Sequence, residues 1–178
     1  MLLVGAFIAL FALAYSAGPF PLSKIGLGDM AVILFYGLVP VIFTCYLITG
    51  SVAEMRFTVP VSFAIGLLAD NVLIVNNYRD VEDDRKVGKL TTAVIFGRKI
   101  MIGIYIINFT LSLLILAFFF LQFRSIFWII GWGVIEIFYI FVVSKIRKSE
   151  GAALNPLLKN TAQLMLLTCV VMLIAAAT

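Results

Sequence analysis

The sequence predicts an all-α fold, a polytopic membrane helical bundle with six transmembrane helices in a single domain of residues 1–178. The first observation is composition: 63% of the residues are apolar and 12% are charged. An ordinary soluble domain has roughly 45–50% apolar and about 25% charged residues. The second is a mean hydropathy of +1.17. The third is that the apolar residues form long stretches without the alternation of a membrane barrel.

The first three predicted spans are Leu2–Ala17, Gly28–Thr49 and Thr58–Asn77. The first is the shortest and begins at Met1 with no polar flank. A signal peptide would need basic residues there, although the small residues near position 16 would suit a cleavage site. We therefore expect a membrane helix and keep a signal peptide as the alternative. Gly, Pro, Ser and charged residues separate the spans, as expected for loops.

The last three predicted spans are Lys99–Gln122, Ile126–Lys145 and Leu157–Ala177. With six crossings, residues 18–27, 78–98 and 146–156 lie on one side of the membrane. Eleven of the thirteen basic residues lie in or beside these segments: Lys24, Arg79, Arg85, Lys86, Lys89, Arg98, Lys99, Lys145, Arg147, Lys148 and Lys159. Because basic loops stay inside, we expect an inner-membrane protein with cytoplasmic charged loops and both termini, including the C-terminus, outside.

Several kinds of site are excluded by what the sequence lacks. It has no histidine, which removes a Ser-His-Asp triad and His-ligated metals, and its two cysteines lie inside apolar runs. A disulfide framework is thereby excluded too. The chemistry must use carboxylates, amides, Lys, Arg, Tyr and a hard metal ion. The lipid bilayer is an expected partner, and no nucleic acid is.

The most informative segment is residues 76–91, which follow an apolar span directly. If the helix continues past Asn77, then Asn76, Asp80 and Asp84 recur every four residues and share one face. Such oxygen ligands suit Mg²⁺, which takes one or two carboxylates together with substrate phosphates. Nearby basic residues, Arg79 and Lys89 among them, would contact a diphosphate. A solvated loop with internal salt bridges is the alternative for an isolated Asp-x-x-x-Asp.

The flanking residues favour the site. The pattern Asn-Asn-x-Arg-Asp-x-x-x-Asp-x-x-x-Gly-Lys-x-Thr at 76–91 resembles the second aspartate-rich motif of the UbiA-type intramembrane prenyltransferases, most closely those of menaquinone synthesis that act on 1,4-dihydroxy-2-naphthoate. Tyr-Ser-Ala-Gly-Pro-Phe-Pro-Leu at 15–22 with Gly-Leu-Gly-Asp at 26–29, and Leu-Asn-Pro-Leu-Leu-Lys at 154–159, are further matches. The resemblance spans essentially the whole chain.

The resemblance implies a nine-helix fold in which two aspartate-rich loops bind a polyprenyl diphosphate through Mg²⁺. Ionisation of the diphosphate gives an allylic cation that the aromatic acceptor attacks, with loss of the carboxylate and formation of demethylmenaquinone in the naphthoate subfamily. It assigns catalysis to Asp80, Asp84 and Lys89, with both aspartates as metal ligands. Substrate contacts would come from Asn76, Asn77, Arg79, Lys24 and Tyr15.

The sequence departs from the family pattern in its first third. The six spans match the family's fourth to ninth helices, and no earlier Asn-Asp-x-x-x-Asp occurs. We therefore expect a C-terminal portion that does not turn over alone. Asp70 lies about 15 Å along a helix from Asp80, too far for the same metal ion, and is a candidate for lining the cavity.

Alternatives stay open at this point. Within the family the acceptor could be a benzoate, homogentisate, haem or a glyceryl lipid. A CDP-alcohol phosphotransferase is disfavoured because its Asp-Gly-x-x-Ala-Arg pattern is missing. A transporter would place more ionisable groups near the membrane midplane. A non-catalytic membrane fragment that lacks half the active site is the remaining alternative.

Overall fold

The computed structural model describes residues 2–17, 21–120 and 126–177. Within these ranges the secondary structure is helical and contains no strand, which confirms the predicted all-α class. Three predicted features lie outside the described residues: the Gly-Pro-Phe element at 18–20, Arg124, and the end of the fourth predicted span at 121–122.

Eleven helical segments, three of them 3-10 or π helices, follow one another along the described residues. Their bounds are α1 Leu2–Ser16, η1 Leu22–Lys24, α2 Gly28–Val32, η2 Ile33–Leu38, α3 Val39–Thr49, α4 Met55–Lys86, α5 Thr92–Phe96, α6 Arg98–Phe120, α7 Ile126–Ile146, η3 Gly151–Leu154 and α8 Asn155–Ala177. The segments α2, η2 and α3 join end to end, as do η3 and α8.

Five of the six predicted spans correspond to helices that are long and apolar enough to cross a membrane. These are Gly28–Thr49, Met55–Lys86, Arg98–Phe119, Ile126–Ile146 and Gly151–Ala177. The first predicted span corresponds to α1, whose 15 residues are apolar but short. At 1.5 Å per residue α1 is about 22 Å long, less than the ~30 Å hydrocarbon thickness.

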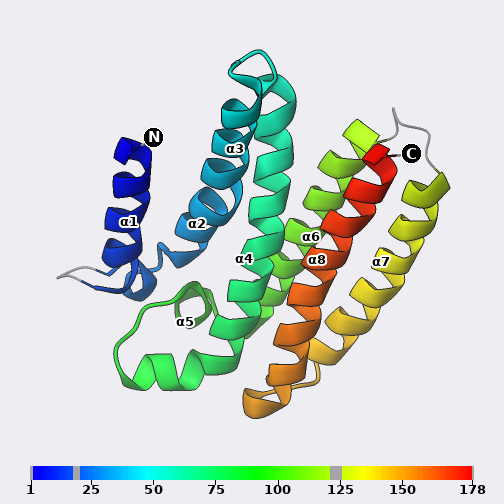
Figure 1. Cartoon of the computed structure of the whole chain (residues 1–178). Helices are drawn as coiled ribbons and strands as arrows, with labels where there is room; N and C mark the ends of the chain where they lie inside the picture. Colours follow the sequence, from blue (N-terminus) through cyan, green and yellow to red (C-terminus); the bar gives the residue numbers. More distant parts are fainter. Residues whose placement is uncertain (1, 18–20, 121–125, 178) are drawn as a thin grey trace.

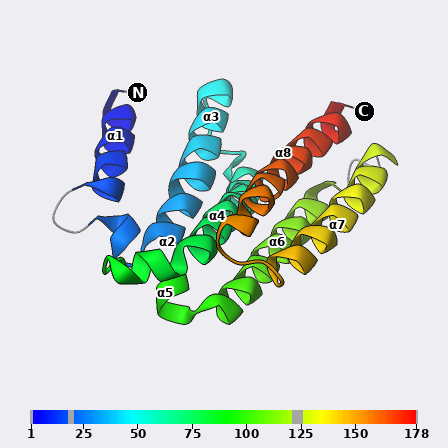
Figure 2. The same cartoon turned by 90° about the horizontal axis from the view of Figure 1, so that it is seen from below.

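The bundle is arranged around α4, which packs against η2, α5, α6 and α8. Figure 1 shows α1 and the α2–α3 helix on one side of α4, with α6, α7 and α8 on the other. Figure 2, viewed from below, shows the same order. The main core runs along the α4, α6, α7 and α8 side, where Ile74, Phe109 and Ile135 are buried.

A very close helix contact joins the α2–α3 helix to α4. The π turn of η2 comes just before Pro40, which has no N–H to donate to the carbonyl four residues earlier. Within this turn, a Cβ at Gly37 would lie 2.4 Å from Gly66 Cα. Only glycine at both positions permits this approach, which fixes α2 against α4.

The three basic segments meet at one end of the bundle, the lower end in Figure 1. Leu90 N–H donates to the Lys24 carbonyl at 2.9 Å, and Arg98 pairs with Glu150 at 3.2 Å. Residues from all three segments therefore touch at this end. The predicted clustering of the segments is confirmed by these contacts.

Candidate functional site

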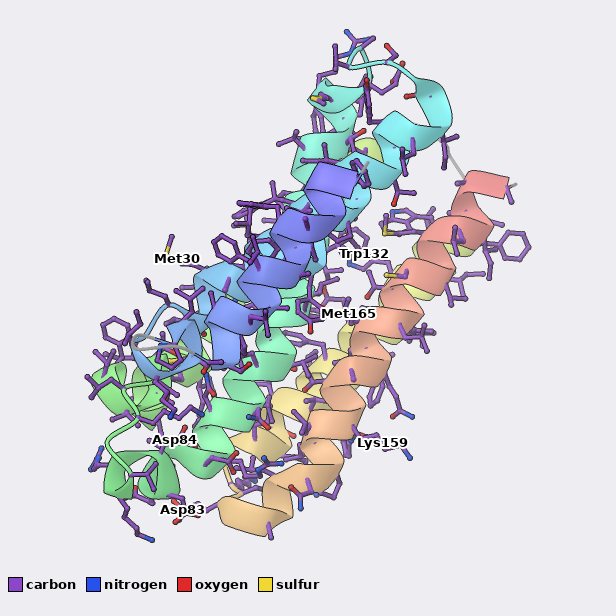
Figure 3. The ribbon with its side chains drawn as sticks, turned by 60° about the vertical axis from the view of Figure 1, so that its left-hand side comes forward. Met30, Asp83, Asp84, Trp132, Lys159 and Met165 are labelled. Carbon is purple, nitrogen blue, oxygen red and sulfur yellow. The ribbon has the colours of Figure 1, made fainter. Side chains whose placement is uncertain are left out.

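The candidate site begins on the last turns of α4. This helix continues nine residues past the predicted end at Asn77, to Lys86. The condition for placing Asn76, Asp80 and Asp84 on one face is thus met. Its 32 residues extend about 48 Å, well beyond the ~30 Å hydrocarbon thickness. In Figure 3, Asp83 and Asp84 lie at this end of α4, beside α5.

Asp84 is buried and is held by the chain that follows α4. Lys89 Nζ lies 3.1 Å from Asp84 Oδ1 and 3.2 Å from Oδ2, and Thr91 Oγ1 donates to Oδ2 at 3.4 Å. The chain reverses at Gly88, whose φ of 71° lies in the left-handed region that glycine tolerates best. This turn brings an ammonium group back to a carboxylate five residues earlier.

Asp80 is paired with its neighbour Arg79. The guanidinium donates from Nε to Asp80 Oδ1 at 2.6 Å and from Nη2 to Oδ2 at 2.7 Å. It also donates to Asn76 Oδ1 and to Asn155 Oδ1, each at 2.9 Å. Arg79 therefore joins α4 to the start of α8. Its hydrogen bonds here go to protein groups, whereas the sequence suggested a direct contact with diphosphate.

A polar cavity of about 250 Å³ opens beside these groups. It is lined by Tyr15, Ser23, Gly26, Gly28, Asp29, Leu73, Asn76, Asn77, Lys89, Thr91 and Thr92. Four of the predicted site residues are among them: Tyr15, Asn76, Asn77 and Lys89. The other four, Lys24, Arg79, Asp80 and Asp84, lie outside this lining. Asp84 nevertheless contacts the cavity indirectly, through Lys89 and Thr91.

A larger apolar cavity of about 700 Å³ adjoins the polar one. It is lined by residues of α1, α2, η2, α4 and α8, including Phe11, Phe35, Val72 and Met165. Met165 lies on α8, labelled in Figure 3. Tyr15, Leu73 and Asn76 line both cavities. The two spaces therefore meet, and together they suit a ligand with a polar head and a long apolar tail.

Sequence reasoning assigned no role to three residues of the polar cavity: Asp29, Thr91 and Thr92. Thr91 precedes α5 and its hydroxyl also accepts from Val94 N–H at 3.4 Å, a long helix-capping contact. Thr92 Oγ1 donates to Asp29 Oδ2 at 2.8 Å. Two threonines directly after Gly-Lys-Leu, and an aspartate in the first turn of a span, were the signals available.

The oxygen donors at the end of α4 fit Mg²⁺ chemically. Asp80 and Asp84 are one helical turn apart, and Mg²⁺ commonly binds one or two carboxylates while substrate phosphates complete its shell. Among the described residues no group of three or more Asp, Glu, Cys or His is close enough to hold a metal. The two carboxylates instead pair with Arg79 and Lys89. The donor set therefore suits a metal that arrives with a diphosphate.

Comparison with known proteins gives consistent relatives. The model of the UbiA prenyltransferase family matches residues 1–170. The 1,4-dihydroxy-2-naphthoate octaprenyltransferase of Haemophilus influenzae is 42% identical over 94 residues, which are 53% of this chain and 30% of that protein. The enzyme of the same name from Escherichia coli is 38% identical over 96 residues, 54% of this chain and 30% of that protein.

A more distant relative is the UbiA prenyltransferase domain-containing protein 1 of Dictyostelium discoideum. It is 32% identical over 102 residues, 57% of this chain and 30% of that protein. The chain therefore spans about a third of the length of the curated relatives it matches. No solved structure matches it.

Proposed function

Since this chain belongs to the UbiA prenyltransferase family, we propose that its protein transfers a polyprenyl group from polyprenyl diphosphate to an aromatic acceptor. The acceptor is 1,4-dihydroxy-2-naphthoate, which loses its carboxylate to give demethylmenaquinone. The names of the bacterial relatives support this acceptor. The reaction is Mg²⁺-dependent, and residues 1–178 act in it as a single transmembrane domain.

The observation that carries the proposal is the junction of the polar and apolar cavities. A polyprenyl diphosphate has a charged head and a long hydrocarbon tail, and the reactive carbon lies between them. Here Lys89 and two asparagines line the polar space, while Phe11 and Phe35 line the apolar one. The shared residues Tyr15, Leu73 and Asn76 mark the place of the reactive carbon.

The roles of the chain's residues follow from their contacts. Lys89, now paired with Asp84, offers its ammonium group to a diphosphate oxygen. Asn76 and Asn77 donate amide hydrogens or accept from the substrate at the cavity wall. Tyr15 lies where head and tail meet and orients the allylic group. The apolar walls exclude water, which would otherwise capture the carbocation.

Asp80 and Asp84 would hold the Mg²⁺. When bound, the metal neutralises negative charge that grows on the departing diphosphate. Arg79 acts through its fork to Asp80 and its bond to Asn76, so it positions two groups of the site at once. Lys24 contributes through its backbone, because its carbonyl accepts from Leu90 N–H and holds the two loops together.

The protein is placed in the inner membrane, with the charged end of the bundle in the cytoplasm and the C-terminus outside. The clustering of basic residues at one end supports this orientation. It also puts the polar cavity on the side where a water-soluble acceptor is available. Accessibility of a cysteine introduced at Val87, which is 77% exposed, to an impermeant thiol reagent in right-side-out and inverted vesicles measures the orientation.

The function is tested with the native protein in lipid nanodiscs, supplied with geranylgeranyl diphosphate and Mg²⁺. Three acceptors are compared: 1,4-dihydroxy-2-naphthoate, 4-hydroxybenzoate and homogentisate. Mass spectrometry should find a prenylated product only from the naphthoate, lighter by one carboxyl group than simple addition gives. Chelation of Mg²⁺ should abolish it. Prenylation of either other acceptor in preference to the naphthoate would overturn the assignment.

A further inference from the structure

A buried pair of carboxyl groups lies behind the polar cavity. Asp29 on α2 and Asp70 on α4 hydrogen-bond to each other. Asp70 is 2% exposed, and its Oδ2 accepts from Asn108 Nδ2 at 2.8 Å. Among the described residues no amide, hydroxyl or ammonium donates to its Oδ1. Because an ionised carboxylate has no hydrogen to donate, two carboxyls can bond only when one is protonated. The pair therefore holds one proton.

The two members of the pair differ in access. Asp70 is enclosed between α4 and α6, whereas Asp29 lines the polar cavity and accepts from Thr92 Oγ1 at 2.8 Å. Asp29 is thus fixed by a hydroxyl on one side and by Asp70 on the other. A singly protonated pair can donate one hydrogen bond and accept others. That combination matches a hydroxyl group, which needs both, while a carboxylate ligand would be repelled.

The position of the pair fits an acceptor better than a diphosphate. A Cβ at Gly28, the residue before Asp29, would lie 3.7 Å from Tyr15 Oη and 3.5 Å from Leu73 Cδ2. Tyr15 and Leu73 line both cavities. Asp29 therefore borders the junction at which the reactive carbon of a prenyl diphosphate would lie. An aromatic acceptor must meet that carbon at close range.

We propose that the Asp29–Asp70 carboxyl pair binds a hydroxyl group of the aromatic acceptor. Asp29 makes the contact, and Asp70 is a positioning residue that shares its proton with Asp29 and holds it in place. This inference rests on the proposed function, since it assigns the second substrate of the same site. The competing explanation is that the pair only joins α2 to α4, as interhelical hydrogen bonds do in membranes.

The test measures binding rather than turnover, by titration calorimetry on the native protein in nanodiscs. The probes are 1,4-dihydroxy-2-naphthoate, 2-naphthoate without hydroxyls, and geranylgeranyl diphosphate with Mg²⁺. Asp29→Ala and Asp70→Leu should raise the Kd for the dihydroxy compound by about tenfold. Asp70→Asn should keep it within about threefold, because an amide can still bond to Asp29 and Asn108. The control, Ser112→Ala, removes a buried α6 hydroxyl that donates to the Ala64 carbonyl of α4.

The outcomes separate the possibilities. Affinity for 2-naphthoate and for the diphosphate should stay unchanged in all four variants. A parallel loss for every probe would mean that the pair only holds helices together, and the inference would be wrong. Unchanged binding of the dihydroxy compound in Asp29→Ala would also overturn it. Wild-type protein that binds diphosphate but neither naphthoate refutes this inference alone, whereas failure to bind diphosphate refutes the proposed function.

Discussion

The contact between Gly37 and Gly66 gives the most direct stability prediction. An alanine at position 37 would place its Cβ 2.4 Å from Gly66 Cα, 2.6 Å from Gly66 N and 2.6 Å from the Ser62 carbonyl oxygen. All three are backbone atoms, so no side-chain rotation relieves the clash. Overpacking costs typically about 1–3 kcal/mol, and the helix gains back about 0.5–1 kcal/mol on replacing glycine. We expect Gly37→Ala to destabilise the protein by about 1–2 kcal/mol.

The matched control is Gly103→Ala on α6, because nothing lies within 4 Å of a Cβ there. Thermal unfolding in detergent is followed with a thiol-reactive dye that reports exposure of Cys45 and Cys169, both partly buried. At about 2–4 °C per kcal/mol, Gly37→Ala should lower the midpoint by about 2–8 °C, while Gly103→Ala leaves it unchanged or slightly raised. Equal shifts in the two variants would refute the close-contact reasoning.

The remaining predictions concern the charged groups at the end of α4. Asp84→Asn should lower turnover about 10–100-fold, whereas Asp83→Asn, a carboxylate 82% exposed, should leave it unchanged; equal losses would contradict the assignment. Lys89→Met should raise the KM for polyprenyl diphosphate about tenfold, with the exposed Lys86→Met as the control that stays at the wild-type value. Arg79→Lys should raise the Mg²⁺ concentration for half-maximal turnover about tenfold, because an ammonium group cannot reproduce the fork; an unaltered Mg²⁺ titration would refute this.

Much of the fold was predictable because membrane spans depend on composition over about 20 residues. Five predicted spans were matched by helices of sufficient length. The end of α4 was less predictable. Its last turns are charged, and charge by itself indicates a loop, yet residues 78–86 continue the helix. The four-residue spacing of Asn76, Asp80 and Asp84 was the signal that favoured continuation.

The contacts of the candidate site were harder to predict than its residues. Lys89 and Asp84 are close in sequence, so a turn at Gly88 could be expected to join them. Contacts between distant segments have no local signal: Thr92 meets Asp29 across 63 positions and Arg79 meets Asn155 across 76. Such pairs depend on how the helices pack, which periodicity does not specify.

Depth along α4 explains why its aspartates have different surroundings. Crossing the hydrocarbon takes about 20 residues, and α4 has 32, so its final turns can lie outside, where Asp80 and Asp84 keep cationic partners. Asp70 lies about 21 Å before Asp84 along the helix. An unpaired charge there would be costly, and the partners at that depth are the Asn108 amide and another carboxyl. Sharing a proton is the arrangement that satisfies both carboxyls. The same residue type therefore suits metal and diphosphate at the end of α4, and an uncharged hydroxyl further in.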